Sequence, residues 1–401
     1  MKLNNFFYLY FLFFLLFGVI LYDLINVKFG FSFIDEISVL IAFIASFNKK
    51  GQLKEYRYLF FIFIFYFINS LVNPHNILPA IINDTVQQIK PYIVFYSIYT
   101  LSEYFLFKDV QKKIICKLCL FFAVILLPFG FYFLFNPDEV LYNGWLHASR
   151  YSTMYCIFGL SYYLYSNKSK RNLFVMTLIL SGGLLSMRSK YFGFYTLFIL
   201  FFYFFKSRNS FNSSLLKRFI FILFALFIIL FAVQDKLMFY FITGTTNVDE
   251  STMMARPLLY QKAYEILCDY PLFGTGFGSY ATDASALYYS PLYSEYGLIF
   301  NNQIGEGLFI SDTYYPVFAQ FGIIGIILFV LFWAKRYEDC KHSYHLGFIQ
   351  FNDFKICLLI IAFFLIESIA DSTLTQNRGA FMMLLLALYT RGFKHKKLIK
   401  K

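Results

Sequence analysis

Apolar runs of about 16–20 residues recur along the whole chain, and they limit its possible folds more than any other feature. A helix of that length crosses the roughly 30 Å of hydrocarbon in a bilayer. The sequence therefore predicts an all-α polytopic membrane protein with about 12 transmembrane helices. The expected spans are residues 6–22, 30–47, 58–73, 91–107, 118–136, 151–166, 172–187, 191–205, 219–234, 313–333, 356–371 and 380–393.

Lysine and arginine cluster in every second loop between these runs. From Lys2 to the basic tail that begins at Arg391, one face of the predicted bundle carries 26 of the 35 basic residues. Basic loops stay in the cytoplasm during insertion, so both termini are predicted to be cytoplasmic, in a bacterial inner membrane. This asymmetry accounts for the net charge of +12, so nucleic acid is not expected as a partner. Membrane lipid is expected, because the basic tail can contact anionic head groups.

The composition agrees with a membrane location. The chain is 59% hydrophobic and 14% charged, whereas soluble domains have about 25% charged residues. The first apolar run lacks a small-residue cleavage site, which favours a retained helix over a signal peptide. No linker or internal repeat is apparent, so residues 1–401 are expected to form one membrane domain. Cys116 and Cys119 form an isolated C-x-x-C pair without a histidine cluster, so no metal and no cofactor are predicted.

One connection is much longer than the others. Residues 235–312, between the ninth and tenth spans, are predicted to form a large periplasmic loop, and long structured loops are usually functional. Within this loop, Gly274-x-Gly276-x-Gly278 lacks the preceding strand and following helix of a dinucleotide site. Two alternatives stay open for this segment. Its backbone amides bind an anion, with Gly274 and Gly276 as substrate-binding residues, or it is a turn that needs glycine for positive φ.

Nine basic residues lie on the outer side, where positive charge opposes the topology signal. They are Lys28, Lys90, Arg150, Arg188, Lys190, Lys236, Arg256, Lys262 and Arg378. A charge at the bilayer centre costs roughly 2.5–3.5 kcal/mol, so such residues tend to face a cavity. Guanidinium groups match phosphate oxygens in bidentate fashion. The arginines therefore indicate an anion site, with Arg188 and Arg256 facing one periplasmic cavity, and the alternative is that they reach the outer head groups.

Carboxylates share the outer half with these cations. They are Asp35, Glu36, Asp312, Glu367 and Asp371. Acids and arginines together suit a site that combines an anionic substrate with proton transfer. The alternative is that they form ion pairs that serve packing alone.

Three segments resemble the O-antigen polymerase (Wzy) family, within the O-antigen polymerase/ligase superfamily. The first is Ser181-Gly-Gly-Leu-Leu-Ser-Met-Arg-Ser189, with an arginine at an outer helix end. The second is Arg256 with the following helix and Pro271-Leu-Phe-Gly-Thr-Gly-Phe-Gly-Ser-Tyr280. The third is the segment that re-enters the membrane, which runs from Ser311-Asp312-Thr313 to Gly322-Ile-Ile-Gly325.

The resemblance implies a periplasmic-facing glycosyltransferase that uses undecaprenyl-pyrophosphate-linked glycans. Arg188 and Arg256 would then stabilise the pyrophosphate leaving group, and Asp312 would accept the proton of the acceptor hydroxyl or orient the group that does. Arg150, Lys190 and Arg378 would bind substrate. Neither a metal nor a cofactor is needed for this chemistry, and a chain-length regulator protein is a further expected partner.

The same resemblance favours a polymerase over a ligase. Ligases of this superfamily typically carry a histidine at the start of the re-entry segment, where this chain has Ser311-Asp312-Thr313. The nearest outer histidines, His75 and His147, lie far away in the sequence. The non-enzymatic alternative is a flippase for lipid-linked oligosaccharides, but the repeat symmetry common in such transporters is not apparent in this chain.

Overall fold

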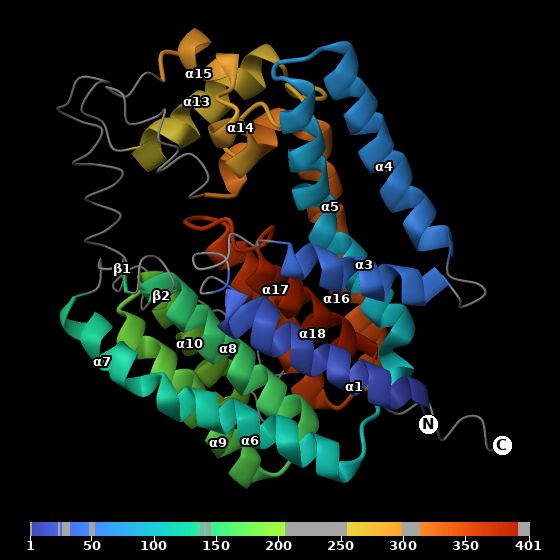
Figure 1. The fold of residues 1–401 in the computed structure, drawn as a ribbon, viewed down its shortest axis with the longest axis vertical. Coiled ribbons are helices and arrows are strands. Elements are labelled where there is room, and N and C mark those ends of the chain that lie inside the picture. The colour runs from blue at the N-terminus through green and yellow to red at the C-terminus, as the bar shows by residue number, and fades with distance from the viewer. Residues whose placement is uncertain are drawn as a thin grey trace, which may run out of the picture.

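The computed structural model describes residues 2–22, 25, 33–47, 53–136, 140–141, 146–204, 255–298 and 313–391. These residues form a bundle of long helices with one short antiparallel strand pair, β1 (Val140–Leu141) and β2 (Leu146–His147) (Figure 1). The first helices are α1 (Lys2–Leu15) with η1 (Leu16–Ile20), α3 (Ile34–Phe47), α4 (Leu53–Val72), α5 (Leu78–Leu101) with η2 (Ser102–Phe105), α6 (Asp109–Ile125) and α7 (Leu127–Phe135). Next come α8 (Ala148–Tyr165), α9 (Lys170–Gly182) with η3 (Gly183–Ser186), and α10 (Ser189–Ile199) with η4 (Leu200–Phe204). The remainder are α13 (Ala255–Asp269), α14 (Asp283–Leu287), α15 (Pro291–Glu295), η8 (Tyr315–Gln320), α16 (Gly322–His345), α17 (Phe351–Glu367) and α18 (Asn377–Arg391).

Each predicted span overlaps a helix where the structure describes it, and the span 219–234 lies outside the described residues. Among the described residues, two helical stretches are each long and apolar enough to cross a membrane, Leu3–Ile20 and Asp109–Phe135. A third apolar helix, Tyr56–Val72, is shorter. The all-α class is confirmed, whereas the count of about twelve spans stays a prediction.

Two predicted boundaries were wrong by many residues. The helix expected at 91–107 begins at Leu78, because polar side chains before Pro91 find partners inside the protein. Asp84, for example, accepts a hydrogen bond from the amide of Gly278 at 2.7 Å. The helix expected at 313–333 begins at Gly322 and continues to His345, and a short turn, η8, precedes it.

Helices α8 and α18 form the centre of the bundle. Every residue of α18 from Asn377 to Thr390 is buried, as is nearly every residue of α8, which suits helices without a polar face. Tyrosine hydroxyls inside the bundle donate to carbonyl groups of neighbouring helices: Tyr389 bonds to the oxygen of Leu160 at 2.7 Å. Such bonds let an apolar interior hold many tyrosines without unsatisfied hydroxyls.

Contacts at opposite ends of α8 and α17 show that these helices are antiparallel. Ser149 bonds to Asp371 at one end, and Lys168 pairs with Asp353 at 2.9 Å at the other end. The predicted topology placed the first pair outside and the second inside. The structure therefore groups the helix ends as that topology does. The cytoplasmic location of the end with Lys168 and Asp353 stays a prediction.

The described part of the predicted large loop is folded. Helices α13, α14 and α15 lie together beside the ends of α4 and α5, at the top of Figure 1. The rest of segment 235–312 lies outside the described residues.

Candidate functional site

Arg188 and Lys190 stand in the turn between α9 and α10. Gly182 and Gly183 let this turn pass close to two tyrosine rings, since a Cβ on either glycine would lie 2.3 Å from a ring atom. Met187 then adopts a left-handed backbone conformation (φ 52°) and reverses the chain. Arg188 becomes the N-cap of α10, and Lys190 falls in the first turn of that helix.

His147 and Arg150 stand at the start of α8. The β1–β2 pair leads into His147, the N-cap residue, whose Nδ1 accepts a hydrogen bond from the Ser149 amide at 3.2 Å. The Ser149 hydroxyl donates to Asp371 Oδ2 at 2.5 Å. Arg150 is the third residue of the helix, so it projects from the same end of the bundle.

Arg378 is the second residue of the central helix α18, and only 2% of it is exposed. Its Nη2 donates to Gln376 Oε1, whereas its Nε and Nη1 have no hydrogen-bond partner among the described residues. Gly379 permits this tight entry, because a Cβ there would collide with the carbonyl oxygen of Thr373. These two buried donors could form charge-assisted hydrogen bonds with an anionic ligand.

Lys190 is held by two carboxylates. Its Nζ lies 2.5 Å from Glu367 Oε2 and 2.7 Å from Asp371 Oδ2, and Thr373 donates to the other oxygen of Asp371 at 2.9 Å. We predicted Lys190 as a substrate-binding residue. In the structure its charge is balanced within the protein, so its direct contacts are with Glu367 and Asp371.

Electrostatic coupling shows that these groups lie close together. Burial, and then the positive charges of Arg378 and Arg150, lower the pKa of His147 to about 3. Arg188 acts on His147 in the same direction, and Asp371 opposes it. The structure thus brings four of the predicted cations into one place, which we call the cation cluster: Arg150, Arg188, Lys190 and Arg378.

All members of the cation cluster occupy the N-terminal ends of helices α8, α10 and α18, and no acidic residue lies in the first turn of these helices. A helix N-terminus already carries positive partial charge, so cations are disfavoured there and anions favoured. Glu367 and Asp371 pair with Lys190, whereas Nε and Nη1 of Arg378 have no hydrogen-bond partner among the described residues. The arrangement is therefore suited to bind an anion.

Two predicted site residues cannot be placed in the cluster. Arg256 is the second residue of α13, but its side chain lies outside the described residues, as does all of Asp312. The prediction that Arg188 and Arg256 face one cavity is therefore untested. The nearest described neighbour of Asp312 in the re-entry segment is Thr313, which is fully buried.

The glycine-rich segment is a structural clasp. Its amides donate within the protein: that of Gly274 to the Tyr270 carbonyl at 3.2 Å, and that of Gly276 to the Gln320 carbonyl at 2.8 Å. Both glycines have positive φ, and a Cβ on Gly274 would lie 2.3 Å from the Gln320 backbone. Neither amide is available to an anion, so we assign both glycines to the turn and not to substrate binding.

The clasp joins two of the segments that resemble the polymerase family. The amides of Ile323 and Ile324, at the start of α16, donate to the carbonyl groups of Pro271 and Leu272 at 2.8 and 3.3 Å. The re-entry segment also contacts the end of α17, since the Tyr314 amide donates to the Ser368 carbonyl at 3.2 Å, and Ser368 follows Glu367, a partner of Lys190. The second and third motif segments are thus joined directly to each other.

His147 is the residue that sequence reasoning missed. It was set aside because it lies far from the re-entry segment in sequence, yet it stands among the arginines of the cation cluster. The sequence feature that could have indicated this is the position of His147 three residues before Arg150, at a predicted outer helix end.

A family model described as "O-Antigen ligase" (Wzy_C) matches residues 173–330, less than half of the chain. The matched region contains all three motif segments, whereas Arg150 and Arg378 lie outside it and join the site through the fold. No curated protein matches the chain. The match supports the superfamily of O-antigen polymerases and ligases, which are membrane-embedded glycosyltransferase-like enzymes that act on lipid-linked glycans.

Proposed function

We propose that the protein polymerises undecaprenyl-pyrophosphate-linked oligosaccharide repeat units into O-antigen or a related surface polysaccharide, at the periplasmic face of the inner membrane. The observation that carries this proposal is the cation cluster, in which two donors of the buried Arg378 have no partner in the part of the chain that the structure describes. A pyrophosphate bears several negative charges on oxygens that match guanidinium donors. It could accept hydrogen bonds from the two donors of Arg378 that lack a partner among the described residues.

The reaction transfers the growing chain from one lipid carrier to the next repeat unit. A hydroxyl at the non-reducing end of the acceptor attacks the anomeric carbon of the donor, and the bond from that carbon to the pyrophosphate oxygen breaks. The electron pair leaves with undecaprenyl pyrophosphate, and the hydroxyl proton passes to a base. Arg378, Arg188 and Arg256 would stabilise the charge that develops on the leaving group, so we expect no metal or cofactor requirement.

Asp312 is our proposed proton acceptor, or the residue that orients it. It is the carboxylate of the re-entry segment, and Tyr314, two residues later, bonds to the backbone beside Glu367. Glu367 and Asp371 already hold Lys190 at 2.5 and 2.7 Å, so they are less suited to accept a proton from substrate. A carboxylate that is already paired with a lysine is a weaker base, so Glu367 and Asp371 are not our candidates for this role.

Ligation of finished polysaccharide to lipid A-core is the second candidate. His147 beside the cation cluster favours it, because the ligase feature that is absent from the start of the re-entry segment is a histidine. The low pKa of His147 and the bond from the Ser149 amide to its Nδ1 place the proton on Nε2. In that state His147 donates a hydrogen bond and does not act as a base, so the polymerase remains our proposal.

Lipopolysaccharide gels of a strain that lacks the gene distinguish these functions. Loss of a polymerase leaves lipid A-core carrying a single repeat unit, because flippase and ligase remain. Loss of a ligase or a flippase leaves bare core, which would contradict the proposal.

A chain-length regulator partner is tested by the same gels. Removal of the regulator should change the length distribution of the polymer while polymerisation continues.

Substitutions of Arg188 and Arg256, which both lie in the matched region, test the site directly. Arg188→Ala or Arg256→Ala should abolish polymer while protein levels stay near normal. Arg→Lys at either position should restore only part of it, because an ammonium group cannot make the bidentate contact. Normal polymer in both alanine variants would remove the proposed roles of these residues.

A further inference from the structure

A lysine and two carboxylates meet between α3 and α5, and none of them takes part in the function proposed above. Lys90 Nζ lies 2.5 Å from Asp35 Oδ2 and 2.9 Å from Glu36 Oε1. Asp35 is fully buried and Lys90 is 5% exposed. We call these three residues the Lys90 triad. It lies at the predicted outer end of the second span, where charged groups are rare and usually functional.

The charges of the Lys90 triad do not balance when all three groups are ionised, because two carboxylates face one ammonium group. Lys190 is held by two carboxylates in the same ratio, but there Arg378 adds a second positive charge that acts on both of them. Among the described residues, Lys90 is the cation within ion-pair distance of its own two carboxylates. An unbalanced buried charge is costly, so a further positive species is expected in the Lys90 triad.

The elements packed around the Lys90 triad do not supply that charge in the part of the chain that the structure describes. Helices α1, η1 and α18 pack against α3, and α4, α14 and η2 pack against α5. Tyr10 of α1 donates its hydroxyl to a backbone carbonyl of α3 at 3.1 Å, and η1 has no ionisable residue. Tyr56 of α4 bonds to two serine hydroxyls, and α14 and η2 bring the acids Asp283 and Glu103. Arg378, in the first turn of α18, acts on the carboxylates of the other lysine.

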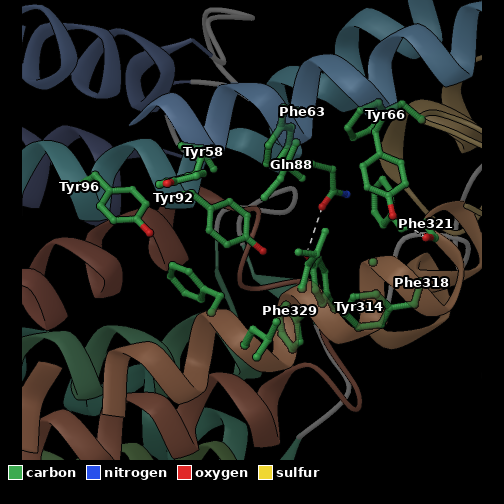
Figure 2. Close-up of a pocket in the computed structure, with 17 residues that line it drawn as sticks. Tyr58, Phe63, Tyr66, Gln88, Tyr92, Tyr96, Tyr314, Phe318, Phe321 and Phe329 are labelled. Carbon is green, nitrogen blue, oxygen red and sulfur yellow. Dashed lines mark hydrogen bonds between the residues drawn. The ribbon is translucent and has the colours of Figure 1, made fainter. Parts of the chain in front are cut away.

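The other side of α5 offers no balancing charge either. Figure 2 shows Gln88, Tyr92 and Tyr96 of α5 at a pocket that also touches α4 and α16. Lys90 stands two positions from both Gln88 and Tyr92, and two positions along a helix lead to its opposite side. Among the described residues that line this pocket, none is ionised at neutral pH. Lys90 therefore faces α3, and its charge is used within the Lys90 triad.

Two carboxylate oxygens of the Lys90 triad lack a hydrogen-bond donor. They are Asp35 Oδ1 and Glu36 Oε2, which are both buried and have no partner among the described residues. The two carboxyl groups are nevertheless in hydrogen-bond contact with each other. An ionised carboxylate can only accept a hydrogen bond, so this contact requires a proton on one of the two groups. Two carboxylates that share a site retain such a proton because like charges so close together cannot both persist.

We propose that Asp35 and Glu36 bind one proton between them at neutral pH, which makes the Lys90 triad a neutral proton-binding site. The proton supplies the missing positive charge and is the donor that the two oxygens lack. The side chain of Glu36 is 28% exposed, so the site can exchange its proton with the surroundings of the bundle. The protonated pair is also a site of modification by an apolar carbodiimide. In that reaction the carboxyl oxygen bonds to the carbodiimide carbon, the proton passes to a nitrogen, and the adduct rearranges to a stable acylurea.

Infrared spectroscopy of the purified full chain in detergent tests for the bound proton. Wild type at neutral pH should show a carbonyl band of a protonated carboxyl group that is lost in Glu36→Gln and in Asp35→Asn. In each variant the remaining carboxylate is balanced by Lys90, and the new amide donates in place of the proton, so the fold should be kept. Spectra of the two variants that show the same band as wild type would overturn the proposal.

Labelling of wild type with dicyclohexylcarbodiimide, followed by mass spectrometry of peptides, is a second test that needs no variant. Glu36 should carry the label, and labelling should decrease as the pH is raised, because an ionised carboxylate has no proton to transfer. Asp353 is the internal control and should stay unlabelled, since its side chain is 15% exposed and it pairs one to one with Lys168 at 2.9 Å. Equal labelling of Asp353 and Glu36 would contradict the proposal. Loss of the infrared band in sodium chloride but not in choline chloride would show that a metal cation occupies the site, and it would refute proton binding.

Discussion

Replacement of Arg378 by methionine should separate stability from ligand binding. Methionine keeps a long flexible side chain but removes the charge and every donor. Nε and Nη1 of Arg378 have no hydrogen-bond partner among the described residues, so few existing bonds are lost. The substitution relieves the desolvation cost of a buried cation, and it also removes the attraction of that cation to Glu367 and Asp371. Because these two effects oppose each other, we expect Arg378→Met to unfold within a few degrees of wild type.

The binding of pyrophosphate should instead be weakened. Hydrogen bonds from charged donors contribute about 1.5–3 kcal/mol each, so the loss of two such bonds costs about 3 kcal/mol or more. That corresponds to a dissociation constant raised by about a hundredfold. Thermal unfolding of the purified chain with and without inorganic pyrophosphate measures both effects, because a ligand that binds the folded state raises the transition temperature.

Arg336 offers a matched control. It is also 2% exposed, but it pairs with Asp339 at 3.0 Å and lies 4.6 Å from the centre of the Phe95 ring. Arg336→Met should therefore destabilise the protein and leave the effect of pyrophosphate intact. A destabilised Arg378→Met variant that still responds to pyrophosphate like wild type would refute the reasoning.

Three further predictions test the topology, the electrostatics and the proposed base. Reporters fused after Asn247 should be periplasmic, and those after Ser210 or at Lys401 cytoplasmic; a cytoplasmic signal at Asn247 would overturn the predicted topology. The pKa of His147 is about 3 in the folded state and about 6.5 when unfolded, so its contribution to stability is present above pH 6.5 and is lost as the pH falls toward 3. His147→Gln should remove about 1.4 kcal/mol per pH unit from the acid dependence of unfolding between those values, and an unchanged slope would contradict the lowered pKa. Asp312→Asn should leave single-unit product if Asp312 is the base and a truncated ladder if it positions another group, whereas full-length polymer would exclude both roles.

The helices were predictable because hydropathy records them directly. A long apolar run can satisfy its backbone in lipid only as a helix, so segments such as 58–73 and 151–166 were found close to their true limits. The start of α5 was missed for the opposite reason. Its first half contains Asp84 and Lys90, whose burial depends on partners far away in the chain. Lys90, for example, lies 2.5 Å from Asp35 Oδ2, and hydropathy carries no information about that contact.

The candidate site was predictable in part, by the same logic. Arginines on the predicted outer side were conspicuous in the sequence, and the fold brings Arg150, Arg188 and Arg378 together. The sequence could not show that Lys190 is already neutralised, because that depends on the end of α17 meeting the start of α10. Nor could it show that the glycine amides are occupied, since their acceptors come from distant segments.

The position of Arg378 follows from a conflict between two requirements of a membrane enzyme. The centre of the bundle must be apolar, and α18 meets that demand along its whole length except at its first turn. A pyrophosphate must nevertheless be held close to that centre if its lipid chain stays among the helices. The N-terminus of a central helix is where the backbone itself favours an anion, so one buried arginine there adds charge and directed donors with little disturbance of the core. If the proposed function is correct, the desolvation cost of this charge is relieved when pyrophosphate binds. Arg378 should then strengthen the binding of pyrophosphate without adding to the stability of the protein alone.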